Sequence, residues 1–209
     1  MQILLVAATA TEIDPFIAVN KRVDVLITGV GVPSTIYHLL KRIHQVDYDL
    51  IIQAGIAGTF KNDLALGNVV LINEDCFADL GIEEKEIFTP VFHTQFADKD
   101  EFPFTDGRLM NLDTNLKYAD LPKAKAITVN KVSDSELQKQ QFVQTFNADI
   151  ETMEGAALHY VCLQEQIPFL QIRSISNQVG EREKAKWKMK EAIENLNKEL
   201  AILINKLTN

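Results

Sequence analysis

The chain has 209 residues, of which 46% are hydrophobic and 24% are charged. This composition is typical of a globular domain that buries its core without disulfides or metals, and it excludes fibrous and disordered classes. The formal net charge is −8, and Lys and Arg cluster only in the mixed run 184–190. Such a balance argues against a nucleic-acid groove or an anionic membrane surface. We therefore expect one domain over residues 1–209 with a small-molecule partner.

The cysteines and the start of the chain indicate the compartment. Cys76 and Cys162 are far apart in sequence, and Cys162 falls within an apolar run, so we expect two buried thiols and a reducing environment. The apolar residues 1–8 are too short for a signal peptide, have no basic region before them, and are followed by acidic Glu12. We interpret them as a core strand and expect a cytoplasmic protein.

Three runs with strand patterns open the chain, at residues 3–7, 23–28 and 49–54. The first is wholly apolar, as in a strand buried on both faces, and Glu12 follows it. The second ends at Gly29-Val30-Gly31, and a helical pattern with Pro33 near its start covers residues 33–43. The third leads into residues 55–58, which we predict as a glycine turn. Glycines at strand ends let the backbone approach a ligand closely, so we expect these turns at one edge of a sheet.

Strands and helices alternate in the rest of the chain, with predicted strands at 66–73, 125–132 and 168–176 and predicted helices at 135–146, 150–164 and 184–207. The last helix carries apolar residues at spacings of three and four, typical of a face packed on a core. Residues 87–120 lack periodicity, and we predict an excursion over the edge of the sheet, where long loops are often functional. The alternation predicts an α/β protein around a mainly parallel sheet, with Glu12 and Asn177 beyond the carboxyl ends of strands.

The predicted helix 150–164 carries an acid on its apolar side. Glu154 lies only about 40° around the helix from Ile150. Burying an ionised carboxylate costs several kcal/mol unless donors or cations meet it. Glu154 therefore either has an internal partner or faces a pocket whose ligand supplies hydroxyl donors. Glu151 lies about 100° from Ile150, and we interpret it as a solvated or salt-bridged acid.

Several well-known sites are absent from the sequence. Gly29-Val30-Gly31 lacks the third glycine of a dinucleotide fingerprint, and the chain has no P-loop and no Gly-x-Ser-x-Gly elbow. The four histidines show no metal-binding spacing and are expected to be structural: His38, His44, His93 and His159. The remaining candidates are Glu12, Glu154 and Asn177. Each also has a structural explanation, respectively as a helix-start acid, a salt-bridged acid and a turn residue.

Four segments together resemble the nucleoside phosphorylase/nucleosidase superfamily: Met153-Glu154-Gly155-Ala156-Ala157, residues 55–58, Glu12, and Arg173-Ser174-Ile175-Ser176-Asn177. Over nearly the whole chain, the sequence looks like the branch that contains methylthioadenosine/adenosylhomocysteine nucleosidases and futalosine hydrolases. The resemblance implies a three-layer phosphorylase/hydrolase-like fold around a central mixed, mainly parallel sheet. It also implies an enzyme without metal or cofactor, acting as a homodimer or larger homo-oligomer.

The resemblance assigns roles to individual residues. Glu154 would accept hydrogen bonds from the ribose hydroxyls and Met153 would pack on the sugar, while Glu12, with Arg173 nearby, would deprotonate a water for attack on C1′. The remaining substrate-binding residues implied are Gly55, Ile56, Ala57, Gly58 and Val132. Carboxylates suit this chemistry, because an N-ribosyl bond breaks through an oxocarbenium-like transition state whose positive charge they stabilise.

Asn177 selects the branch. Adenine-specific nucleosidases carry an aspartate at this position, whereas a neutral asparagine offers N–H donors to N7 or to a 6-oxo group. Asn177 therefore favours hypoxanthine, and its role is counted with the catalytic residues. The segments Ala78-Asp79-Leu80-Gly81 and 177–182 also look like futalosine hydrolases.

The nucleophile is expected to be water. The first loop reads Ala8-Thr9-Ala10-Thr11, without the phosphate-binding arginine of the phosphorylases. The implied reaction is hydrolysis of futalosine to hypoxanthine and dehypoxanthine futalosine in menaquinone biosynthesis, with His93 and Arg108 as weak candidates for binding the 5′ substituent. The alternatives are a methylthioadenosine/adenosylhomocysteine nucleosidase, a 6-oxopurine phosphorylase, and an inactive nucleoside-binding relative.

Overall fold

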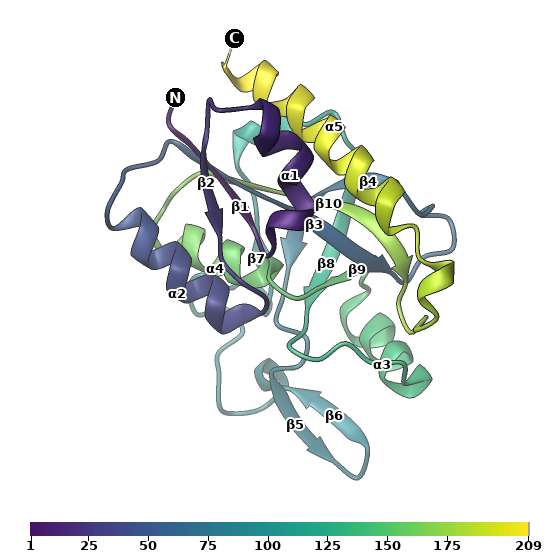
Figure 1. The fold of residues 1–209 in the computed structure, drawn as a ribbon. Helices are drawn as coiled ribbons and strands as arrows, with labels where there is room; N and C mark the ends of the chain where they lie inside the picture. Colours follow the sequence, from purple (N-terminus) through teal and green to yellow (C-terminus); the bar gives the residue numbers. More distant parts are fainter. Residues whose placement is uncertain (209) are drawn as a thin grey trace.

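A mixed sheet of eight strands forms the centre of the structure, a computed structural model that describes residues 1–208 (Figure 1). The strands are β1 (Ile3–Ala7), β2 (Asp24–Ile27), β3 (Leu50–Thr59), β4 (Val69–Asp75), β7 (Leu109–Met110), β8 (Lys123–Thr128), β9 (Ile150–Thr152) and β10 (Phe169–Gln178). Parallel pairs are β1–β2, β1–β3, β3–β10, β4–β8 and β8–β9, and antiparallel pairs are β3–β9, β4–β7 and β4–β10. Because β10 pairs with both β3 and β4, the strands β3, β10, β4, β8 and β9 close into a ring. The expected α/β fold around a mixed sheet is confirmed.

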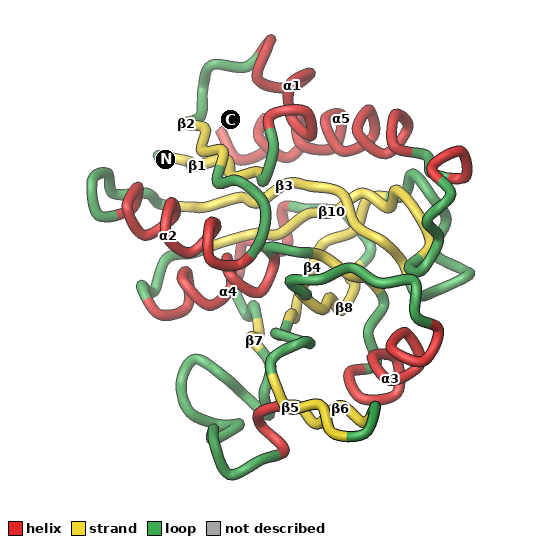
Figure 2. The backbone as a smooth tube through the Cα atoms, turned by 60° about the horizontal axis from the view of Figure 1, so that its bottom comes forward, coloured by secondary structure: helices red, strands yellow, loops and turns green. Residues whose placement is uncertain are grey.

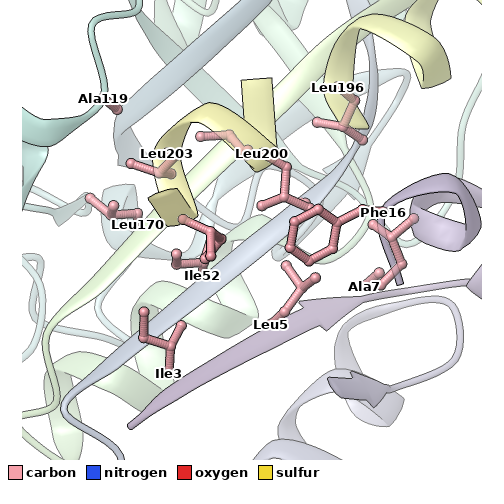
Figure 3. Packing of buried hydrophobic residues seen from close by; sticks show 14 of the residues in the cluster. Ile3, Leu5, Ala7, Phe16, Ile52, Ala119, Leu170, Leu196, Leu200 and Leu203 are labelled. Atoms are coloured by element: carbon pink, nitrogen blue, oxygen red, sulfur yellow. The ribbon is translucent and has the colours of Figure 1, made fainter. Parts of the chain in front are cut away.

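Helices cover two sides of this sheet (Figures 1 and 2). Helices α1 (Ala10–Val19) and α5 (Met189–Thr208) pack on one side, and α2 (Val32–Ile43) and α4 (Gly155–Gln164) pack on the other. Successive side chains of a strand point to opposite faces. Accordingly, alternate residues of β1 belong to different core clusters, Ile3, Leu5 and Ala7 with α1 and α5, and Leu4 and Val6 with α2 and α4. Figure 3 shows Phe16 of α1 between Leu5 and Leu200.

The predicted apolar stripe of the last helix is confirmed. Leu196, Leu200 and Leu203 are buried in the cluster that also contains Phe16. The helix begins at Met189, because residues Lys184–Lys186 form a short 3-10 turn of their own. Cys76 and Cys162 are both buried and free, as expected for two structural thiols.

Two predicted elements near the acids are wrong in kind. Residues 55–58 are not a turn, because β3 continues to Thr59 with β10 paired alongside up to Gln178. Residues Ile150–Thr152 are not helical either, because β9 fills the gap between β3 and β8 and α4 begins only at Gly155. Both segments gain backbone hydrogen bonds from strands that are distant in sequence, which a local pattern does not contain.

The segment predicted as an excursion contains short elements that leave the sheet and return to it. Its first strand, β6 (Ile87–Pro90), forms a separate hairpin with the preceding strand β5 (Gly81–Glu84), seen at the bottom of Figures 1 and 2, and helix α3 (Glu136–Phe146), later in the chain, lies near this hairpin. The 3-10 turns η1 (Val91–His93) and η2 (Thr114–Tyr118) flank β7, which returns the chain to β4. Among the helices of residues 1–208, none has the length and apolar character needed to span a bilayer.

Candidate functional site

A cavity of about 540 Å³, here called the main cavity, lies where β3, β9 and β10 meet the first turns of α1 and α5. Of the residues predicted to bind or react, it is lined by Glu12, Ile56, Ala57, Gly58, Val132, Met153, Glu154 and Asn177. Two other predicted residues, Gly55 and Arg173, do not line it and lie next to Glu12 beneath its floor. The tertiary structure thus gathers residues from five separate parts of the chain around one space.

Glu12, which lines the main cavity, is held in place by hydrogen bonds from two elements. It lies in the first turn of α1, where its Oε2 accepts hydrogen bonds of 2.9 Å from both the backbone N–H and the hydroxyl of Thr9. Its Oε1 accepts from the backbone N–H of Ile56 in β3 at 3.1 Å. Three donors from two elements therefore fix the orientation of a side chain that is 8% exposed.

Gly55 creates room for Glu12 and Arg173. A Cβ at this position would collide with the Arg173 guanidinium and would lie 2.9 Å from Oε1 of Glu12. Arg173 is 1% exposed and donates from Nη2 to Oε1 of Gln53, so its charge stays beneath the acids of the cavity. The structural reason for a glycine here is close approach between side chains, since β3 is regular at this point.

Glu154 is the residue that caps α4, not a residue in the middle of the helix as predicted. Its Oε1 accepts a hydrogen bond of 2.9 Å from the backbone N–H of Gly31, and within residues 1–208 it forms no ion pair. Burial raises the pKa of Glu154, and the charge of Glu12 adds to that rise, whereas Arg173 and the Gly31 N–H lower it. Of the two explanations left open by the sequence, both hold in part, because the Gly31 N–H is an internal donor to Glu154 and the residue also lines the main cavity.

Hydroxyl groups hold the start of α4, and with it Glu154, in place. Thr152 Oγ1 accepts from the Gly155 N–H at 3.2 Å, and Thr128 Oγ1 accepts from the Ala156 N–H at 2.8 Å. Thr128 in turn donates to Asp75 Oδ1 at 3.0 Å. These bonds satisfy backbone donors that a helix start leaves free. A Cβ at Gly155 would collide with Asp75, which explains the glycine after Glu154.

Asn177 also lines the main cavity, beside Gly58. Its Oδ1 accepts from the Ser176 hydroxyl at 2.8 Å, and its Nδ2 donates to the backbone carbonyl of Gln178 at 2.9 Å. These two contacts fix which end of the amide carries the NH2 group. An NH2 group has two hydrogens, so one remains for a ligand.

The interpretation of Glu151 as a solvated or salt-bridged acid is wrong. Its residue is 8% exposed, it lines the main cavity, and within residues 1–208 it forms no ion pair. Burial raises its pKa to about 7, with a further rise from Asp79 and an opposing effect of Arg182. The prediction of one helix over residues 150–164 placed Glu151 away from the apolar side, so it was not recognised as a cavity residue. Three residues that are all buried show no strand periodicity, so the sequence contained no local signal for this strand.

The weak candidates for the 5′ substituent lie elsewhere. Arg108 pairs with Glu74 at 3.2 Å, and together with His93 it lines a separate cavity of about 110 Å³. Residues that sequence reasoning missed, Arg182 and Trp187, line the main cavity instead. His159 is fully buried with Nδ1 3.0 Å from the Leu109 carbonyl, and burial lowers its pKa to about 4. It is thus a core histidine, as expected.

The chain belongs to the phosphorylase superfamily, whose family model matches residues 15–208. Futalosine hydrolase of Thermus thermophilus is 30% identical over 173 residues, covering 80% of this chain and 75% of that protein. Futalosine hydrolase of Acidothermus cellulolyticus is 26% identical, covering 86% and 74% respectively. The family expected from the four motifs is confirmed.

Solved structures share the fold at lower sequence identity. Futalosine hydrolase of Helicobacter pylori superimposes with a TM-score of 0.83 at 16% identity, covering 99% of this chain and 98% of that one. A methylthioadenosine/adenosylhomocysteine nucleosidase of Colwellia psychrerythraea, solved in complex with adenine, gives 0.83 at 18% identity, covering 99% and 96%. At these identities the likeness concerns the fold.

Proposed function

We propose that the protein hydrolyses the N-ribosyl bond of futalosine and releases hypoxanthine and dehypoxanthine futalosine, a step of menaquinone biosynthesis. The observation that carries the proposal is the gathering of Glu12, Glu154 and Asn177 around one cavity of nucleoside size, about 540 Å³. The 30% identical futalosine hydrolase of Thermus thermophilus supports the choice of substrate. Two buried acids suit a reaction in which positive charge develops on a sugar.

Glu12 is the general base in this proposal. Its three hydrogen bonds come from donors of α1 and β3, so the carboxylate is held in one orientation toward the cavity. A positioned base contributes about 10²- to 10⁴-fold to a proton transfer. Arg173 lies behind Gly55 and supplies positive charge beneath the acids without entering the cavity. We assign it a positioning role within the set of catalytic residues.

Glu154 binds the ribose hydroxyls. Its pKa is raised by burial, so the carboxylate gains from any additional donor that a ligand brings. Met153, Ile56 and Ala57 give this part of the cavity apolar surface on which the sugar can pack. Glu154 would also stabilise the positive charge that develops as the bond to the base breaks.

Asn177 binds the base. Its free N–H would donate to N7 or to the 6-oxo group, and a donor at N7 helps the base to leave with its bonding electrons. Gly58 and Val132 also line the cavity, and in this proposal they contact the plane of the base. A matched donor of this kind can change specificity by several orders of magnitude.

Water is the nucleophile in this proposal. Ala8, Thr9 and Thr11 line the cavity near Glu12, and the one arginine among the lining residues, Arg182, is exposed and comes from the segment before α5. A phosphorylase needs cationic donors for phosphate, which Arg offers best. The small hydroxyl-bearing residues around Glu12 support a water site better than a phosphate site.

The test is to incubate the purified protein with futalosine, inosine and methylthioadenosine, each with and without phosphate, and to measure the free base by chromatography. Release of hypoxanthine from futalosine at a rate independent of phosphate is the expected result. Release of adenine alone would assign a methylthioadenosine/adenosylhomocysteine nucleosidase, and a strict need for phosphate would assign a 6-oxopurine phosphorylase. No release from any nucleoside would favour an inactive binding protein.

The proposal also covers the domain organisation, the compartment and the assembly of the enzyme. We regard residues 1–209 as one three-layer domain around a mainly parallel sheet. Helix pairs on two sides of the sheet and packing of α1 against α5 support this description. We further propose a cytoplasmic homodimer or larger homo-oligomer, in keeping with two buried free thiols and with the exposed apolar residues Val30 and Tyr37. Sedimentation of the purified protein would test the assembly.

A further inference from the structure

Asn197 is the one polar residue among the buried residues of α5, which spans Met189–Thr208. It is 6% exposed, and its neighbours Leu196 and Leu200 are fully buried in the core cluster that also contains Phe16 of α1 (Figure 3). Asparagine is a poorer helix former than leucine, and burying an amide without hydrogen-bond partners is costly. A structural reason for this residue must therefore come from the groups to which its amide bonds.

The amide of Asn197 bonds to three backbone groups. Its Oδ1 accepts a hydrogen bond of 2.9 Å from the Phe16 N–H, and its Nδ2 donates to the carbonyls of Glu12 at 2.8 Å and Ile193 at 2.7 Å. Both hydrogens of the NH2 group are thus used, and exchanging the two ends of the amide would turn this group toward the Phe16 N–H. The orientation of the amide is therefore fixed by its partners.

These bonds fall in α1 next to a place where the helix lacks one of its own. The Glu12 carbonyl and the Phe16 N–H are four residues apart, which is the pair that an α-helix joins. The preceding pair, the Thr11 carbonyl and residue 15, cannot form a bond, because Pro15 has no N–H and its ring crowds that carbonyl. The first turn of α1 is therefore less firmly joined to the rest of the helix, and Asn197 bonds across this place.

Asn197 also connects two walls of the main cavity. Glu12 and Ile193 both line the cavity, and the carbonyls of both accept from the same NH2 group. The Glu12 carboxylate accepts from the Ile56 N–H, so the residue is held by β3 at its carboxylate and by α5 at its backbone. Two attachments on different elements restrict the place of the carboxylate more than either one does alone.

We propose that Asn197 is a positioning residue for the general base, because its amide fixes the backbone of Glu12 relative to α5 and thereby sets where the carboxylate meets the water. This role rests on the proposed function, in which Glu12 deprotonates the water. A displacement of about 1 Å at a reacting group can lower a rate about 10²-fold. Asn197 itself does not line the cavity, so its effect should pass through Glu12.

Replacing Asn197 by leucine tests this role. Asn197→Leu removes the three hydrogen bonds, keeps a side chain of similar size, and leaves the Glu12 carbonyl and the Phe16 N–H free to bond to one another. We expect kcat for futalosine to fall about 10- to 100-fold, while KM stays as in the wild type. Asn195→Leu is the matched control on the same helix, since it loses an amide bond of 2.8 Å to the Gly67 carbonyl and should keep the wild-type kcat.

A second measurement separates positioning from a purely structural role. Asn197→Leu is combined with Glu12→Gln, and single-turnover rates give the coupling between the two changes. If Asn197 acts through the Glu12 carboxylate, its replacement should lower the rate no further once that carboxylate is gone. A structural role would lower the fraction of folded enzyme, and with it the rate, by the same factor in both backgrounds.

Asn197→Ser is the second variant where Asn197→Leu does not fold. A serine hydroxyl bonds to the carbonyl four residues earlier in its own helix but lacks the atoms that reach α1, so the same loss of kcat is expected. Thermal unfolding of each variant checks that the rates are measured on folded protein.

The outcomes separate this role from the proposed function. If the wild type cleaves futalosine, and Asn197→Leu either keeps the wild-type kcat or loses the same factor with and without Glu12, the positioning role is overturned and the function stands. If the wild type cleaves inosine or methylthioadenosine but not futalosine, the function is overturned, and the same pair of substitutions measured on that nucleoside decides the positioning role. A wild type that cleaves no nucleoside overturns both.

Discussion

Replacing Glu12 by glutamine tests the general base, and the structure gives the size of each effect. Glu12 accepts from Ile56 N–H with one oxygen and from Thr9 with the other, whereas glutamine has a single acceptor oxygen. Whichever way the amide is turned, its NH2 group faces one of two backbone donors. One buried N–H then loses its partner, which should lower the free energy of unfolding by about 1–3 kcal/mol.

The kinetic effect of the same change should be larger than its effect on stability. Loss of a general base lowers turnover by about 10²- to 10⁴-fold, which corresponds to about 3–5 kcal/mol in the activation barrier. Binding of the nucleoside should be nearly unchanged, because Glu154, Met153 and Asn177 are left intact. The loss should therefore appear in kcat and not in KM or in the dissociation constant.

The assay combines single-turnover release of hypoxanthine, calorimetric binding of futalosine and thermal unfolding. Glu194→Gln is the matched control, since Glu194 lies on the outer face of α5 with a side chain that is 62% exposed. The destabilised variant should melt lower by about 2–4 °C per kcal/mol for a protein of this size. Turnover of Glu12→Gln equal to that of the control would remove Glu12 from the mechanism.

Four further predictions follow from contacts around the main cavity. Gly55→Ala should push Arg173 and Glu12 apart and lower kcat at least tenfold. Gly58→Ala, beside Asn177 and Val179, should mainly raise KM. If both variants changed kcat and KM equally, the assignment of Gly55 to catalysis and Gly58 to binding would be contradicted. Asn177→Asp should increase cleavage of methylthioadenosine relative to futalosine, and an unchanged ratio of the two rates would refute the role of the amide. Thr128→Val removes the hydroxyl that accepts from the Ala156 N–H and donates to Asp75, so the free energy of unfolding measured in urea should fall by about 1–3 kcal/mol. Thr208→Val, at an exposed position, is the control. Burial raises the pKa of Glu151 from its ordinary 4.5 to about 7, so between these pH values the folded protein keeps a proton that the unfolded chain has lost. The contribution of Glu151 to stability therefore falls as pH rises from about 4.5 to 7. Melting temperatures across that range should depend less on pH in Glu151→Gln than in the wild type, and parallel curves would count against a buried acid.

Local patterns were sufficient where a residue's neighbours in sequence decide its environment. The continuous apolar run over residues 3–7 predicted a strand buried on both faces, and β1 indeed divides its side chains between two helix pairs. The spacing of leucines in the last helix predicted a packed face, and Leu196, Leu200 and Leu203 are buried. In both segments the pattern of apolar residues along the chain indicates which side chains are buried.

Local patterns failed where a distant strand supplied the hydrogen bonds. Residues 55–58 contain two glycines, and their sequence favours a turn over a strand. Their pairing with β10, more than 100 positions later, extends β3 through them. Residues 150–152 adjoin a true helix, and only the open place between β3 and β8 makes them a strand. In such segments the pairing of distant strands overrides the local secondary-structure propensity.

The sequence by itself determined the class of the protein, because its four motifs resemble one superfamily, and it singled out Glu12, Glu154 and Asn177 as candidate site residues. Only the tertiary structure decided what surrounds them. It showed that Glu154 forms no ion pair within residues 1–208, placed Arg173 next to Glu12 and Gly55, and brought Glu151 to the wall of the main cavity beside Gly58. The physical reason is that burial and hydrogen-bond partners depend on strands that meet across the sheet, and such contacts leave no trace in the spacing of residues along one segment.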